Sequence, residues 1–204
     1  MLNKVVVAPI GHQGAGKDFL TKAVIRHCGS DRVSVISTGG MFRGVAKHLG
    51  MPQDRPTCNR IVKALVGEFG GDFLAVAIEQ AILQDPKEVI VYDCPRRLED
   101  MDMLDRLALS CKVLSVFLER SAEDRFAALR ERGREGEAGM THDVFQINEG
   151  LEQEKNIEKL RLRVGSTIKC SGTNGQLDAQ KMTWCQEKLP SYAAVNWDEW
   201  SPLN

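Results

Sequence analysis

A short glycine-rich segment holds the residues that are best suited to bind phosphate groups. It reads GHQGAGKD, runs from Gly11 to Asp18, and directly follows the apolar run at residues 5–10. Successive backbone N–H groups in such a loop, continued into a helix N-terminus, can surround an anion, and Lys17 adds a positive charge for the outer phosphates. A plain glycine-rich turn is the alternative. The strand-like run before the loop and the amphipathic pattern after it favour phosphate binding.

Two further groups of candidate residues follow other strand-like runs. STGGMFR, at residues 37–43, offers hydroxyl groups that can cap a helix and places Arg43 one turn into that helix. YDCPRR, at residues 92–97, offers Asp93 for a magnesium-bound water and Arg96 for a phosphate. Capped helices with solvated arginines are the alternative for both, and the glycine-rich loop favours the functional interpretation of Asp93 and Arg96.

An arginine-rich helix follows the next strand-like run. Phosphoryl transfer depends on positioning and on neutralising charge, so arginines over the phosphates are expected in such a site. Arg130 and Arg134 are four residues apart and share a helix face while the helix continues. For any single arginine, a solvated helix end is the commoner explanation. The arginines of this segment are Arg125, Arg130, Arg132 and Arg134.

Strand-like and helix-like segments alternate along the chain, which predicts a parallel sheet with helical crossovers. We expect strands at residues 5–10, 33–36, 88–92, 113–118 and 166–170, and helices at residues 17–27, 41–49, 59–66, 73–83, 99–109, 122–132, 151–161 and 177–188. Ligands of open α/β sheets bind beyond the carboxyl ends of the strands. The candidate residues above follow four of these strands.

The composition excludes several classes of protein. The 204 residues fit one domain, and the net charge of −1 provides no overall attraction to nucleic acid or to an anionic membrane. No apolar run approaches transmembrane length, and no signal-peptide pattern is seen. The six cysteines form no C-x-x-C pair, so reduced thiols and a cytoplasmic location are expected.

Four segments together resemble the adenylate-kinase-like P-loop nucleoside and deoxynucleoside monophosphate kinases. GHQGAGK, STGGMFR, DCPRR and RERGR stand in the family's order, and the turn SGTNG at residues 171–175 resembles the one beside the donor base. The resemblance covers the chain from Val5 to about Gly175. It implies an α/β P-loop NTPase fold, with a five-stranded parallel sheet flanked by helices, a helical acceptor-binding flap and a short lid.

The resemblance also implies a division of this single domain, residues 1–204. The core would comprise residues 1–40, 86–132 and 150–190. The acceptor-binding flap would be residues 41–85, the lid residues 133–149, and a tail residues 190–204.

Residue roles follow from the same resemblance. Lys17, Arg43, Arg96 and Arg134 would neutralise charge during transfer, and Asp18 and Asp93 would serve Mg²⁺. The acceptor would be held by Thr38, Gly39, Arg43, Asp93, Arg96 and Asp100. The donor ATP would be held by Gly11, His12, Gln13, Gly14, Ala15, Gly16, Lys17, Asp18, Phe19, Arg130 and Asn174.

The chain departs from the family pattern in three places. DCPR is one residue shorter than the family's D-G-F-P-R, so either Arg96 or Arg97 fits the phosphate position, and the shorter form favours Arg96. Asp100 stands near the position of the usual base-reading glutamine, which makes guanine or cytosine as plausible as adenine. The lid lacks zinc cysteines, and its second half, residues 141–148, lacks arginines.

We therefore expect an ATP-dependent kinase that acts on a nucleoside or deoxynucleoside monophosphate. The binding partner would be this small molecule, and we expect no association with a membrane. We expect the protein to be a monomer or a homodimer. Alternative acceptors for the same fold are dephospho-coenzyme A, phosphomevalonate and a hydroxymethylated base in DNA. A non-catalytic ATP-binding module is the alternative from another class.

Asp18 replaces the usual Ser or Thr of the loop, a variant shared with phosphomevalonate kinase and phage deoxynucleotide kinases. A carboxylate beside polyphosphate is favourable with a metal between them, so we predict that Asp18 contacts Mg²⁺, directly or through water. The alternative is an acid favoured by the helix dipole. Asp18→Ser is expected to change the magnesium dependence of turnover, measured by titrating the metal at fixed ATP. An unchanged magnesium dependence would indicate that Asp18 does not contact the metal and is favoured by the helix dipole alone.

Overall fold

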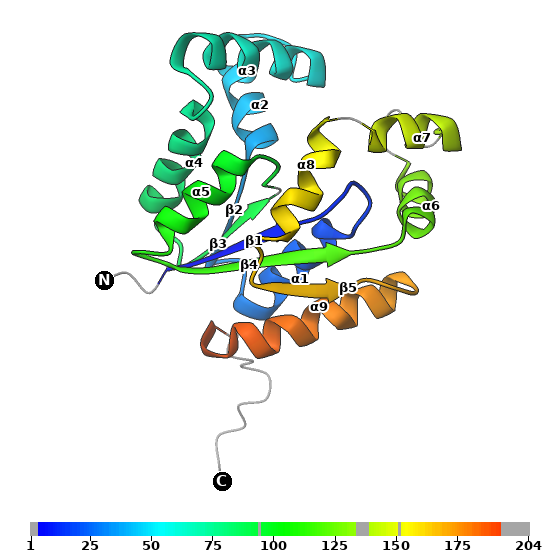
Figure 1. Ribbon diagram of the computed structural model, residues 1–204. Coiled ribbons are helices and arrows are strands. Elements are labelled where there is room, and N and C mark those ends of the chain that lie inside the picture. The colour runs from blue at the N-terminus through cyan, green and yellow to red at the C-terminus, as the bar shows by residue number, and fades with distance from the viewer. Residues whose placement is uncertain (1–3, 94, 134–138, 151, 193–204) are drawn as a thin grey trace.

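A five-stranded parallel sheet forms the middle layer of the computed structural model (Figure 1), which describes residues 4–93, 95–133, 139–150 and 152–192. The strand order is β2-β3-β1-β4-β5, and every pairing is parallel. The predicted five-stranded parallel sheet flanked by helices is thus confirmed. The strands are β1 (Val5–Ile10), β2 (Val33–Ser37), β3 (Val89–Asp93), β4 (Lys112–Glu119) and β5 (Ser166–Lys169).

The central strand β1 is buried along its whole length because helices cover both faces of the sheet. Its odd-numbered valines, Val5 and Val7, pack with α1 (Lys17–Cys28) and α9 (Asn174–Lys188) on one face. Its even-numbered residues pack with the helices of the other face. Those helices are α4 (Phe73–Gln84), α5 (Leu98–Leu107) and α8 (Glu152–Arg161).

Helices α2 (Thr38–His48) and α3 (Arg55–Phe69), together with α4, extend beyond the carboxyl end of β2 (Figure 1). The α2 helix begins at Thr38, three residues before the predicted start, because the Ser37 hydroxyl accepts a hydrogen bond from the Gly40 amide. A separate apolar cluster that includes Phe42, Cys58 and Leu74 joins these three helices. Their assignment as the acceptor-binding flap remains a prediction.

The chain beyond β4 differs from the expectation in two places. After α6 (Ala122–Arg132), a further helix, α7 (His142–Glu149), lies within the residues assigned to the lid. Thr141 caps this helix. The α9 helix starts three residues early because Thr173 and Gln176 form a reciprocal cap. A short 3₁₀ turn, η1 (Pro190–Tyr192), follows α9, and the remainder of the predicted tail lies outside the described residues.

Among the described residues, no helix combines the length and the apolar character that crossing a bilayer requires.

Lys4 ties the start of β1 to the end of α4, and its loss tests how this helix is anchored. The buried ammonium donates to the carbonyl oxygens of Ile82, Leu83 and Asp85, at 2.8, 3.1 and 2.6 Å. Lys4→Met would leave these carbonyls without that donor, so we expect a loss of about 2 kcal/mol in unfolding free energy by urea denaturation. Lys112→Met, which removes an exposed contact to the Lys188 carbonyl, is the control and should change stability by less than about 0.5 kcal/mol.

Candidate functional site

The glycine-rich loop connects the carboxyl end of β1 to the N-terminus of α1, where the sequence placed a phosphate site. Two of its glycines have positive φ angles, 81° at Gly14 and 94° at Gly16, in the region that disfavours other residues. At Gly14 a Cβ would also lie 2.7 Å from the carbonyl oxygen of Arg125. The loop therefore packs against the arginine-bearing helix α6 through a contact that only glycine allows.

Lys17, at the start of α1, curls back over the loop. Its ammonium donates to the carbonyl oxygens of Gly11 and His12, at 2.7 and 2.9 Å, so its charge lies beside the loop's backbone. Asp18 follows in the first turn of α1, and one of its carboxylate oxygens lies 3.7 Å from Nη1 of Arg132. The structure thus brings Lys17, Asp18 and the end of α6 to one edge of the sheet.

A buried carboxylate, Glu154 on α8, connects this loop with Arg96. Its Oε1 accepts from Nη1 of Arg96 at 2.7 Å, and its Oε2 lies 3.0 Å from Nδ1 of His12. The backbone N–H of Gln13 also points to Oε2, at 3.4 Å. The second ring nitrogen of His12 lies 2.9 Å from a carboxylate oxygen of Glu158, one turn along α8. Two segments predicted to bind phosphate are thereby joined through one side chain.

This network shifts the pKa values of its members. Burial by itself would raise the pKa of Glu154, but the His12 hydrogen bond and the charge of Arg96 outweigh it and lower that pKa to about 2. The hydrogen bond to Glu154 raises the pKa of His12, burial opposes it, and the contact with Glu158 adds to the rise. The raised pKa of His12 and the lowered pKa of Glu154 both favour the charged pair of an imidazolium and a carboxylate.

Two more arginines hold the donor side of the edge. Arg125 is buried and forms a bidentate ion pair with Glu149 at the end of α7, with N–O distances of 2.7 and 2.5 Å. Arg120 donates to the carbonyl oxygen of Gly14 at 3.1 Å. The Arg120 bond holds the loop from the β4 side, and the ion pair of Arg125 joins α6 to α7.

In the part of the chain that the structure describes, one cluster has the composition of a metal site. Ligand atoms of His12, Glu149 and Glu154 lie within 4.8 Å of one another. Arg125 and Arg96 already pair with the two carboxylates, so the cluster is a network of ion pairs. Asp18 and Asp93, the predicted magnesium residues, are not among its members.

The acceptor-side candidates lie at the ends of the neighbouring strands β2 and β3. Thr38 and Gly39 open α2, and a Cβ at Gly39 would lie 3.4 Å from Nη1 of Arg43, so the guanidinium lies against this glycine. Asp93 ends β3 and is half-buried. Strand β3 lies between β2 and β1, so these groups share one side of the loop.

Asp100 lies buried at the N-terminus of α5, where its carboxylate already has several hydrogen-bond donors. It is 3% exposed and accepts from the backbone N–H groups of Arg96 and Arg97, at 2.9 and 3.0 Å, and from the Arg97 guanidinium at 2.7 Å. Asp100 therefore caps the N-terminus of α5 and engages Arg97, while Arg96 reaches Glu154. Its predicted role toward a base remains untested.

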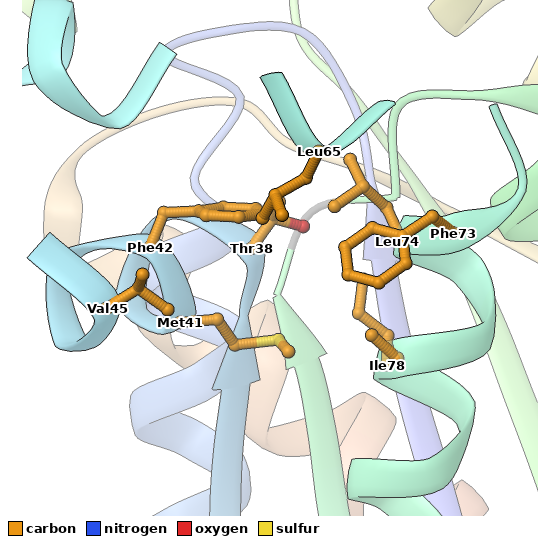
Figure 2. A pocket seen from close by; sticks show the side chains of 9 residues that line it. Thr38, Met41, Phe42, Val45, Leu65, Phe73, Leu74 and Ile78 are labelled. Carbon is orange, nitrogen blue, oxygen red and sulfur yellow. The ribbon is translucent and has the colours of Figure 1, made fainter. Parts of the chain in front are cut away.

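Next to Thr38 an apolar pocket lies between α2, α3 and α4. Figure 2 shows the rings of Phe42 and Phe73 on two sides of it, with Leu65 between the helices and the Thr38 oxygen near the centre. Thr38 supplies the only oxygen or nitrogen among the lining side chains. The pocket measures about 100 Å³, below the roughly 300 Å³ of a whole-ligand site, so it suits one ring of a larger molecule. The lining residues are Thr38, Met41, Phe42, Val45, Leu65, Phe73, Leu74, Ala77 and Ile78.

The candidates for the donor base lie on the far side of β1. The exposed Arg130 has its guanidinium 5.8 Å from the centre of the Phe126 ring. Asn174 opens α9, and its amide nitrogen lies 3.4 Å from a carboxylate oxygen of Glu131 on α6. The start of α9 thus lies beside α6. Arg134 lies outside the described residues, together with residues 135–138 of the predicted lid.

Sequence reasoning did not identify Glu149 or Glu154 as parts of this site, and it did not single out Arg120. Both acids belong to segments rich in charged residues, a pattern typical of solvated helices. No local signal distinguishes Glu154 from its exposed neighbour Glu158. Only the crossover that carries α8 over β1 brings Glu154 to the loop.

The fold agrees with that of several kinases of known structure. Shikimate kinase from Bacteroides thetaiotaomicron aligns over 90% of this chain and 97% of its own, with a TM-score of 0.58 and 15% identity. A gluconokinase from Sinorhizobium meliloti gives 0.52 and 13% identity over 89% of this chain and 90% of its own. A putative kinase from Chloroflexus aurantiacus gives 0.52 and 16% identity over 95% and 100%. The chain therefore has a P-loop kinase fold.

The sequence is also distantly similar to that of a curated protein. A UPF0200 protein from Hyperthermus butylicus is 25% identical over 135 residues, which cover 66% of this chain and 69% of that protein. No protein-family model matches the chain.

The ion pair between His12 and Glu154 predicts a pH dependence. Glu154, Glu158 and Glu149 raise the pKa of His12 above its ordinary value of about 6.5, while burial and Arg125 oppose them. Because the folded-state pKa is raised, this contribution to stability is complete below the unfolded value and is lost as pH rises through the folded value. NMR titration should find the His12 pKa above about 6.5, and Glu154→Gln should lower it. His12→Asn identifies the resonance, and an unshifted pKa in the unmodified protein would contradict the pairing.

Proposed function

We propose that this protein is an ATP-dependent phosphotransferase whose acceptor is a nucleoside or deoxynucleoside monophosphate. The observation that carries the proposal is the arrangement at the carboxyl edge of the sheet. The loop from Gly11 to Lys17 follows the central strand, acceptor-side candidates follow β2 and β3, and the arginine-bearing α6 follows β4. A donor phosphate chain on the loop would face the acceptor across a short distance along this edge.

Different groups of the protein would bind the donor phosphates and the acceptor phosphate. The loop amides and the α1 N-terminus would hold the donor phosphates, and Lys17 would leave the Gly11 and His12 carbonyls to reach the outer ones. Arg96 and Arg43 would hold the acceptor phosphate. This acceptor oxygen is already an anion, so positioning and charge neutralisation suffice and no general base is required.

Magnesium fits the carboxylates at this edge. Asp18 lies in the first turn of α1 and Asp93 at the end of β3, and hard carboxylate oxygens are the ligands Mg²⁺ prefers. These two residues would hold the ion, directly or through water. The bound ion would supply neutralisation of the charge on the polyphosphate.

The apolar pocket beside Thr38 supports an acceptor with a flat apolar ring. Phe42 and Phe73 can pack against the faces of a nucleobase, and the Thr38 hydroxyl offers one polar contact. Arg43 lies on the same helix, one turn beyond Thr38, so base and phosphate could be held by one element.

The structural neighbours suggest a second candidate, a small hydroxylated acid, because two of them are a shikimate kinase and a gluconokinase by name. Such an acceptor carries several hydroxyl groups and a carboxylate. In a pocket lined by methyl groups and phenyl rings those hydroxyls would lose hydrogen bonds to water without replacement. The lining therefore favours the nucleotide.

A panel of acceptors with magnesium and ATP tests the proposal by ADP release. We expect one nucleoside or deoxynucleoside monophosphate to exceed shikimate, gluconate, dephospho-coenzyme A, phosphomevalonate and hydroxymethylated DNA. Lys17→Ala should reduce transfer by at least about 100-fold while thermal unfolding stays unchanged, because the lysine supplies charge at the phosphates.

A preference for shikimate or gluconate would show that the acceptor is a hydroxylated acid and not a nucleotide. Tight ATP binding without ADP release on any acceptor would instead identify a non-catalytic ATP-binding module. Lys22→Ala, on the exposed part of α1, is the matched control for the lysine change and should retain full transfer.

A further inference from the structure

The carboxylate of Glu154 lies between the donor loop and the candidate acceptor arginine. It accepts from Nη1 of Arg96 at 2.7 Å, and the backbone N–H of Gln13, on the donor loop, points to it from 3.4 Å. It also pairs with the ring of His12 at 3.0 Å. In the transfer reaction, the group between the donor loop and the acceptor arginine is the phosphoryl group that moves.

The partners of Glu154 are the kinds of donor that hold a phosphoryl group. A guanidinium, the ring of His12 and a loop backbone N–H surround one small anion, the carboxylate of Glu154, a residue that is 5% exposed. Phosphate oxygens form the same charge-assisted bonds with each of these donors. A phosphoryl group could therefore replace the carboxylate without leaving any of the three donors unpaired.

We propose that Glu154 occupies the position of the transferred phosphoryl group while the site is empty of nucleotide, and leaves it when the donor and acceptor bind. The inference rests on the proposed function. A buried carboxylate close to polyphosphate would repel it. Phosphate binding and Glu154 binding to the same donors therefore exclude each other, and α8 must release the loop for the reaction to proceed.

The placement of α8 gives this exchange a mechanical consequence. Glu154 and Glu158 both anchor the helix to His12 and hence to the loop. Figure 1 shows α8 beside the loop that follows β1, and the chain reaches α8 from α7 in the predicted lid. Release of Glu154 would thereby transmit the arrival of phosphate from the donor loop to α8 and to α7, which precedes it.

Binding of inorganic pyrophosphate, measured by calorimetry without acceptor, tests the exchange. Glu154→Gln removes the competing charge and keeps the side-chain size, so we expect it to bind pyrophosphate at least about fivefold tighter than the unmodified protein. Glu187→Gln is the matched control, because it makes the same change of charge at an exposed position of α9. Its affinity should change by less than about twofold.

Equal or weaker binding by Glu154→Gln would show that Glu154 supports the phosphate site as a fixed part of it, and would overturn the inference while leaving the proposed kinase intact. Failure of every variant, including the unmodified protein, to bind pyrophosphate or transfer phosphate would overturn both.

A second measurement uses the unmodified protein and does not depend on the variant folding. Ligands normally slow amide exchange, but loss of the Glu154 anchor should speed exchange in Glu152–Arg161 when pyrophosphate is added. Slower or unchanged exchange in this helix would contradict release.

Discussion

The site depends on the close packing of the glycine-rich loop against the chain that follows β4. Gly14 lies so near the Arg125 carbonyl that any side chain at this position would collide with backbone, and Arg120 donates to the Gly14 carbonyl from the same segment. Loop and arginine helix are therefore one unit. The loop directs the N-terminus of α1 at the sheet edge, and the same contacts set where α6 begins and which way its arginines face. Neither half could be displaced without the other.

The order of the strands then separates the two substrates. Because β1 is flanked by β3 on one side and by β4 on the other, the groups after β2 and β3 meet the loop from one side and α6 and α9 meet it from the other. In a parallel sheet with crossovers on both faces, the connections cover the faces and leave this edge open to ligands. The crossover through α8 is the exception, since it brings Glu154 back over β1 to the centre of the edge. This buried acid thus joins Arg96, on the side of β3, to the loop that follows β1.

Much of the fold could be predicted because its signals are local. Valine-rich strands, the glycine loop and the hydroxyl cap at Ser37 depend on neighbours within a few residues, and the strand ends were predicted to within one residue. The helix starts were late where a cap extends the helix, as at Thr38 and Asn174. The roles of Asp100 and Glu154 could not be read locally. Asp100 caps its own helix, and Glu154 becomes buried only through a contact 142 residues away in sequence.

The electrostatics of the edge explain how an arginine-rich site is kept in a protein of net charge −1. Two arginines at this edge each pair with a different acid. Arg96 pairs with Glu154, and the buried Arg125 pairs with Glu149. Removing charges from water is costly, so these pairs limit the penalty of assembling positive charge before an anion arrives. The two pairs differ in kind. Arg125 meets Glu149 through both oxygens and also packs on the Phe145 ring, which makes it a fixed support. Glu154 divides its two oxygens between Arg96 and His12 of the loop. The two arginines therefore differ in their acids: Glu149 gives both of its oxygens to Arg125, whereas Glu154 is shared between Arg96 and the loop.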